Sequence, residues 1–285
     1  MTAPNDKRTL PFGGSFAIFD DEVLASLPNL LQVDSASFCK KYLDWIKTTK
    51  LNTLIGLENF PFAAYSNGTT EAFDKFYMKN NKRRFRCFKG EYVYHQISWR
   101  NNWPNWKFIE DEPLDEHDAV VISLPFSDTG NTHLQMHQVL TICTELKIPV
   151  LIDCAYFGVC SDIEFNFNYN CITDITFSLS KTFPLAYARV GMRLTRTDDD
   201  DPLLMLHKIE YTNRIGAALG LKTMEIYSPD YIVNKYKQKQ IDLCNTLGVD
   251  PSNTVLFGID YKNKYPEYNR GGQSNRLGLH RHFNV

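Results

Sequence analysis

The chain lacks two features: a long run of apolar residues, and an excess of charge of either sign. No stretch of its 285 residues approaches the ~18 consecutive apolar residues of a transmembrane helix. The 31 Lys and Arg nearly balance the 33 Asp and Glu, which gives a formal net charge of −2. Such a balance does not support a basic surface for nucleic acid. We therefore expect neither a membrane nor a nucleic acid as a partner.

The sequence also lacks the cysteine spacing of a zinc ribbon, and no apolar export signal follows its polar N-terminus. Its seven cysteines include no Cys-x-x-Cys pair, which is typical of reduced thiols in the cytoplasm. His133 and His137 lie four residues apart on an expected helix, but no third metal ligand accompanies them. We therefore expect a solvent-facing helix there, in a cytoplasmic protein without a metal site.

Short apolar segments alternate with amphipathic segments through most of the chain. Residues 119–124 and 149–153 are continuous apolar runs, typical of buried parallel strands, and residues 131–146 between them have helical periodicity. This alternation predicts an α/β fold in which a mainly parallel sheet is sandwiched between helices. Further strands are expected at residues 63–66, 84–88, 106–109, 175–179 and 190–195, and further helices at 69–77 and 202–226.

The same patterns divide the chain into two expected domains. A large domain would comprise residues 50–225. A reduced, small α+β domain would comprise residues 1–49 plus 226–285, with a helix at 231–247 and closing strands at 255–259 and 276–280.

Polar residues follow several of the expected strands, at the edge where parallel sheets bind ligands. Asn67-Gly68-Thr69-Thr70 joins a strand to a helix, where free backbone N–H groups and two hydroxyls could bind a phosphate or could serve only as a helix cap. Asp153 ends a buried strand and needs a partner such as an arginine or a protonated ring nitrogen. Lys181 follows another strand and could form a Schiff base if burial lowers its pKa. Arg189 could bind a phosphate bidentately.

In this order and spacing, these groups resemble the fold type I pyridoxal-phosphate enzymes, the aspartate aminotransferase superfamily, and in particular its class I/II aminotransferases. The resemblance covers residues 60–195; Asp153 precedes Lys181 by 28 residues, and Lys181 precedes Arg189 by eight. It implies that pyridoxal 5'-phosphate is the cofactor and that the protein is a homodimer. It also implies that Lys181 holds the cofactor as an internal aldimine and then acts as general acid and base at the substrate Cα.

The resemblance assigns roles to further residues. Asp153 would pair with the pyridine nitrogen, Tyr156 would donate to the phenolic oxygen, and Tyr92 would stack on the pyridine ring. The ligands of the phosphate group would be Gly68, Thr69, Thr70, Ser178 and Arg189.

Two features depart from the family pattern. Ser127 stands where the family has an asparagine beside the phenolic oxygen, and a hydroxyl there could still donate a hydrogen bond. The small domain is short, because only 104 residues follow Lys181. Within it, Arg276 is expected to bind the carboxylate of the substrate, with Arg270 and Arg281 as alternatives.

The reaction implied is that of an aminotransferase, which moves an amino group between an amino acid and a 2-oxo acid. Lyase, decarboxylase, racemase and cyclase chemistry on an amino acid remain open, because the sequence does not show which Cα bond is aligned for cleavage. A protein that kept the fold as a binding module is a further alternative. The intact set of Lys181, Asp153 and Arg189 argues against it.

Overall fold

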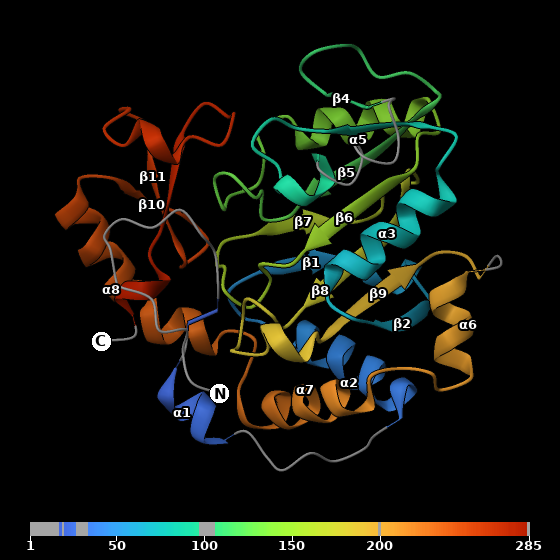
Figure 1. The fold of residues 1–285 in the computed structure, drawn as a ribbon, viewed down its shortest axis with the longest axis horizontal. Coiled ribbons are helices and arrows are strands. Elements are labelled where there is room, and N and C mark those ends of the chain that lie inside the picture. Colours follow the sequence, from blue (N-terminus) through green and yellow to red (C-terminus); the bar gives the residue numbers. More distant parts are fainter. Residues whose placement is uncertain (1–16, 19, 27–33, 97–105, 199–200, 284–285) are drawn as a thin grey trace.

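The structure is a computed structural model that describes residues 17–18, 20–26, 34–96, 106–198 and 201–283. A seven-stranded sheet forms its centre, with the strand order β2-β9-β8-β6-β5-β3-β4 (Figure 1). The strands are β2 (Phe62–Ser66), β3 (Arg84–Cys87), β4 (Trp106–Phe108), β5 (Asp118–Ser123), β6 (Val150–Cys154), β8 (Ile172–Ser178) and β9 (Gly191–Thr195). β9 runs antiparallel to both of its neighbours, and the other pairings are parallel. The predicted mainly parallel α/β sheet is confirmed.

Both faces of the sheet are covered, as the continuous apolar runs predict. Ala119 and Val121 of β5 pack with Phe73 of α3 (Thr69–Lys79), whereas Val120 and Ile122 point into the opposite core. That larger core also receives α2 (Ser35–Lys47), α5 (Met136–Glu145) and α7 (Arg214–Ile226). Successive side chains of a strand point to opposite faces, so apolar residues are needed from Ala119 to Ile122, through the middle of β5.

A smaller unit lies beside the ends of the central strands (Figure 1). It contains the antiparallel sheet β10 (Asp250–Pro251), β11 (Phe257–Asp260) and β12 (Asn275–Gly278), on which α8 (Tyr231–Leu247) packs. The buried Gln240 side-chain amide donates to the carbonyls of Ser252, Thr254 and Phe257, and it thereby fixes α8 to the turn before β11. Short α1 (Asp21–Ser26) joins this unit through an ion pair of 2.6 Å between Asp20 and Lys235.

Several elements differ from the sequence-based expectations. The expected helix at 202–226 is two helices, α6 (Pro202–Lys208) and α7, because the backbone of Glu210 takes a left-handed conformation with φ of 59° between them. The short strands β1 (Thr53–Ile55) and β7 (Glu164–Asn166) form a separate parallel pair that we did not predict.

The division into two domains remains a prediction. Because α2 packs against α7 and β2, its contacts favour counting this helix with the large domain rather than with residues 226–285. Within the described part of the chain, no helix combines the length and the apolar character needed to span a bilayer.

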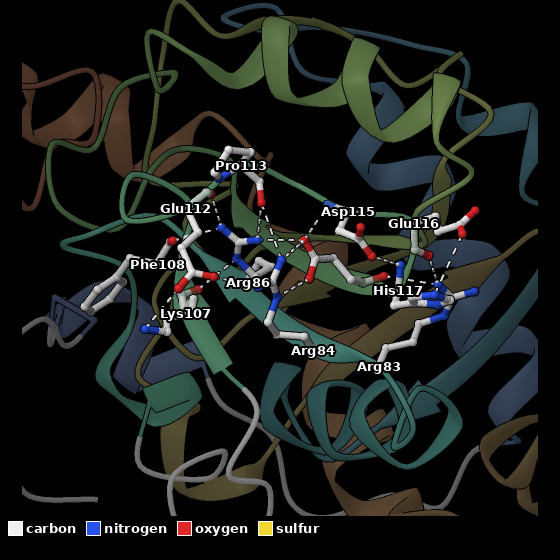
Figure 2. A network of polar contacts seen from close by, with 11 residues as sticks. Arg83, Arg84, Arg86, Lys107, Phe108, Glu112, Pro113, Asp115, Glu116 and His117 are labelled. Atoms are coloured by element: carbon white, nitrogen blue, oxygen red, sulfur yellow. Dashed lines mark hydrogen bonds and ion pairs between the residues drawn. The ribbon is translucent and has the colours of Figure 1, made fainter.

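A buried ion-pair network holds the sheet edge at which β3 and β5 begin (Figure 2). Arg86 is fully buried, and its Nη1 lies 2.6 Å from Asp118 Oδ2. Arg84 Nε lies 2.6 Å from the other oxygen of the same carboxylate. The Arg86 guanidinium also donates to the carbonyls of Lys107, Phe108 and Pro113. The described hydrogen-bond and ion-pair partners of the buried Arg86 guanidinium are therefore all oxygen atoms of the protein.

Asp118→Ala removes the carboxylate that two arginines share, and it leaves one of them as a buried, uncompensated cation. We expect this variant to lower the free energy of unfolding by about 3–5 kcal/mol. The control is Lys107→Gln, which breaks a half-exposed ion pair with Glu112 and should cost less than ~1 kcal/mol. Urea denaturation followed by circular dichroism measures both, and equal costs for the two variants would contradict the prediction.

Candidate active site

A cavity of about 490 Å³ opens where the carboxyl ends of the central strands meet the smaller unit. The sequence-predicted residues on its wall are Thr69, Thr70, Tyr92, Ser127, Asp153, Tyr156, Ser178, Lys181, Arg189 and Arg276. The structure thus brings together residues from separate loops and strands that are spread over more than 200 positions. Of the two alternatives to Arg276, Arg270 also lies on the wall and Arg281 does not. Val93, Ala155, Ser180 and Ala186 complete the wall and were missed.

The turn between β2 and α3 forms one end of the cavity. Gly68, just behind the wall, has φ of 75°, and a Cβ there would lie 2.5 Å from Arg189 Nη2. That nitrogen donates to Asn67 O at 2.9 Å and to Thr70 Oγ1 at 2.8 Å. Gly191 backs the turn, since its own Cβ would lie 2.9 Å from Gly68 Cα. Glycine is therefore required at both positions, and the first N–H groups of α3 and a guanidinium line the same hollow.

Ser178 shapes the turn that leads from β8 to Lys181. Its Oγ accepts a hydrogen bond from Ser180 N at 3.1 Å and donates one to Val190 O at 3.1 Å. Tyr65 OH donates to Arg189 O at 2.9 Å, on the other side of the same loop pair. These contacts fix the segment that carries Lys181 and Arg189 to the ends of β8 and β9.

Asp153 ends β6 as a buried carboxyl beside a second buried carboxyl. Its strand partner on β5 is Ser123, whose backbone N–H and hydroxyl both donate to Glu91. Asp153 itself accepts from Ala155 N at 3.0 Å. Burial and then the nearby Glu91 raise the pKa of Asp153 well above its ordinary value, and burial also raises the pKa of Glu91. A cationic group arriving in the cavity would oppose this shift and favour the charged form of Asp153.

Lys181 lies in the same cavity and is shifted in the opposite direction. Burial lowers the pKa of Lys181, and the positive charges of Arg276 and Arg189 lower it further, against the opposing effects of Tyr156 and Asp153. A lowered pKa increases the fraction of neutral amine at neutral pH, which is the form that attacks carbonyl carbons and accepts protons.

Two arginines from the smaller unit meet Ser127 at the other end of the cavity. Arg276 Nη1 donates to Ser127 O at 2.5 Å, and Arg270 Nη1 donates to the same oxygen at 2.9 Å. Arg270 Nη1 also donates to Ser127 Oγ at 3.1 Å. The serine hydroxyl accepts from Arg270 and keeps its own proton for donation into the cavity.

Two tyrosine rings, those of Tyr92 and Tyr156, are part of the wall. The Tyr92 ring lies nearly parallel to that of Tyr94, with an interplanar angle of 15°. The Arg276 guanidinium lies 4.4 Å from the centre of the Phe257 ring, and its Nη1 donates to Tyr156 OH at 3.4 Å. Such flat groups suit a planar ligand.

The two histidines considered as metal ligands lie elsewhere. His133 lies before α5, stacked on Phe88 at 3.6 Å, and the exposed His137 donates to or accepts from Tyr169 OH at 3.1 Å. The solvent-facing expectation holds for His137 only, because His133 packs on a core aromatic ring. The described residues contain no group of three or more His, Cys, Asp or Glu placed to hold a metal ion.

Asp153→Asn is expected to stabilise the protein purified without small ligands, in a pH-dependent way. The folded chain binds a proton on Asp153 more tightly than the unfolded chain, because its pKa is raised. The associated stability is complete below the ordinary carboxyl pKa of ~4 and is lost as the pH rises through the raised value. The variant should therefore melt at least ~2 °C above the wild type at pH 8 and at the same temperature near pH 4. Differential scanning fluorimetry measures this, with the exposed Glu145→Gln as control; a gap that does not change with pH would refute it.

No protein-family model and no curated protein sequence matches the chain. Solved structures do. The pyridoxal-phosphate-bound C–S lyase of Staphylococcus hominis superposes with a TM-score of 0.67 and 10% identity, over 94% of this chain and 86% of that one. Alanine aminotransferase of Pyrococcus furiosus gives 0.64 and 12% identity, over 93% and 84%. L-threonine-O-3-phosphate decarboxylase of Porphyromonas gingivalis gives 0.59 and 11% identity, over 93% and 94%. This chain has the fold of the fold type I pyridoxal-phosphate enzymes.

Proposed function

We propose that the protein is a pyridoxal-phosphate-dependent aminotransferase that moves an amino group between an amino acid and a 2-oxo acid. The observation that carries the proposal is one cavity that holds a buried lysine with a lowered pKa and a buried carboxyl with a raised pKa. Shifts in opposite directions are typical of groups tuned for chemistry rather than for stability.

The residues of the cavity fit pyridoxal phosphate at each of its polar positions. The hollow at Gly68, which any Cβ would fill, offers N–H groups, the Thr70 hydroxyl and Arg189 to a phosphate. Asp153 would hold the protonated ring nitrogen, which supplies the positive charge that two neighbouring buried carboxyls favour. Thr69 would add a donor to the phosphate, Ser178 would add another once its hydroxyl turns away from Val190 O, and Tyr92 would cover the ring.

Pyridoxal phosphate, when bound, withdraws electrons from the Cα of an attached amino acid. The chain would contribute the proton transfers. Lys181 would carry the cofactor covalently, and its neutral amine would then take the Cα proton and return it at another atom. Asp153 would keep the proton on the ring nitrogen. Tyr156 and Ser127 would each donate to the phenolic oxygen, and Arg276 would orient the substrate through its carboxylate.

The similar structures include aminotransferases, a C–S lyase and a decarboxylase. These reactions differ in the bond broken at the substrate, so product analysis separates them. An amino-acid panel with a 2-oxo acid as amino acceptor should give a new amino acid and no free ammonia. Ammonia release in place of a new amino acid would show a lyase, and release of carbon dioxide would show a decarboxylase.

Lys181→Ala should abolish the visible absorption band that the wild type acquires with added pyridoxal phosphate, because the covalent attachment is lost. Turnover should fall by at least ~10²-fold, the usual contribution of a proton-transferring group. Lys222→Ala, on the outer surface of α7, is the control and should keep both properties. A variant that keeps its band without Lys181 would rule out this residue as the attachment site.

A homodimer and a cytoplasmic location belong to the same proposal. All seven cysteines are free and buried, which supports a reducing compartment. Large apolar side chains are exposed at Tyr187 and over the segment from α6 to the start of α7, at Met205, Ile209, Tyr211 and Ile215. Tyr187 belongs to the short helix 186–188, which packs on α7 and lines the cavity through Ala186. A second copy of the chain would remove this surface from water and close the site.

Tyr211→Asp combined with Ile209→Asp should shift the protein from a dimer to a monomer of 32.9 kDa, because two charges would be buried at the interface. Multi-angle light scattering at micromolar concentration measures the mass. Ile226→Asp, at the far end of α7, is the control and should leave the dimer intact. A wild-type mass of 32.9 kDa would refute the homodimer.

A further inference from the structure

The cavity wall contains three arginines, and the proposed function uses only two of them. Arg189 belongs to the phosphate hollow, and Arg276 is assigned to the carboxylate common to all amino acids. Arg270 remains. It precedes β12 and was only an alternative to Arg276 in the sequence, yet the structure places both on the wall.

Arg270 is held in place by neutral oxygens. Its Nη1 donates to Ser127 O and Ser127 Oγ, and its Nη2 donates to Glu91 O at 3.4 Å. Among the described residues, no carboxylate lies within the 4.0 Å of an ion pair with Arg270. Two buried carboxyls, those of Asp128 and Glu91, interact electrostatically with Arg270. Burial raises the pKa of each against the opposing charge of Arg270, so that the net shift disfavours their charged forms. The chain therefore orients this guanidinium without neutralising it.

Arg270 and Arg276 lie side by side, because both donate to the single carbonyl oxygen of Ser127. Two adjacent cations repel each other, and burial and then the charge of Arg270 lower the pKa of Arg276. An anion at each guanidinium would remove that repulsion. The arrangement suits two anionic groups separated by only a few bonds.

We propose that Arg270 binds a second anionic group, at the end of the substrate's side chain, so that the protein acts on short acidic amino acids and the matching 2-oxo acids. The proposal rests on the proposed function and names its substrate class. The group is a carboxylate, as in aspartate or glutamate, or a phosphate, as in O-phosphoserine. A neutral side chain would leave a partly buried guanidinium without its partner, which selects against such substrates.

The rival arrangement is that both arginines bind the same carboxylate. The two differ in what the loss of Arg270 does to neutral substrates. If Arg270 binds only the side chain of the substrate, its loss should leave KM for alanine and glutamine unchanged. If it binds the carboxylate common to all amino acids, its loss should raise KM for every amino acid by the same factor.

The experiment measures kcat and KM of the cofactor-loaded enzyme for aspartate, glutamate, O-phosphoserine, alanine and glutamine. The wild type should prefer the anionic substrates. Arg270→Gln should raise KM for the preferred anionic substrate roughly 10- to 100-fold with little change in kcat, and it should leave alanine and glutamine unchanged. Arg270→Lys should recover part of the loss because it restores the charge. Arg281→Gln is the matched control off the cavity wall.

A second measurement separates this proposal from the proposed function. Calorimetry with succinate and butyrate reports on the anion site without turnover, and succinate should bind more tightly by an amount that Arg270→Gln removes. If the protein acquires no cofactor band, the proposed function fails and this arm alone decides on Arg270. A wild-type preference for neutral substrates, an equal loss for alanine and aspartate in Arg270→Gln, or equal binding of succinate and butyrate would each overturn the proposal. The ratio of aspartate to O-phosphoserine shows whether the group is a carboxylate or a phosphate.

Discussion

The burial of a carboxyl at the end of β6 is the constraint on which the rest of the site depends. Asp153 is removed from water, its strand partner Ser123 is committed to a second buried carboxyl, Glu91, and the amine of Lys181 shares the same cavity. Such a cluster opposes folding, so the stability must come from other regions. It comes from a sheet with apolar side chains on both faces, while at the other end of β5 Asp118 compensates the charge of the buried Arg86. At one end of these strands buried polar groups form the site and oppose folding, whereas at the other end the buried charges compensate one another.

The sequence was sufficient to predict the elements that depend on burial alone. A strand covered on both faces is apolar through its middle, so the strands within residues 119–124 and 149–153 were recognisable, and α8 has the predicted bounds. The direction of β9 was not recognisable, because a parallel and an antiparallel strand bury the same side chains. The break between α6 and α7 depends on one left-handed residue, Glu210, whose side chain gives no signal of it.

The site shows the same distinction. Side chains whose chemistry is unusual at the end of a strand, such as Asp153 and Lys181, could be chosen from the sequence. The part played by Ser127 could not, because its carbonyl oxygen does as much as its hydroxyl, and every residue type has a carbonyl. Arg270 was ambiguous for a related reason. It lies in an irregular loop, where no periodicity indicates the direction in which a side chain points.

The contact of Gly68 with Gly191 has a consequence for engineering the protein toward other ligands. A Cβ on Gly191 would lie 2.9 Å from Gly68 Cα, and a Cβ on Gly68 would lie 2.5 Å from Arg189 Nη2. Any single substitution of Gly68 or Gly191 would therefore place a side chain on atoms that are already present. Substituting both together would push β2 away from β9. The ligand preference of the hollow can be changed only through the side chains around it, by replacing the hydroxyl of Thr70 or shortening Arg189. Its floor is fixed by the backbone.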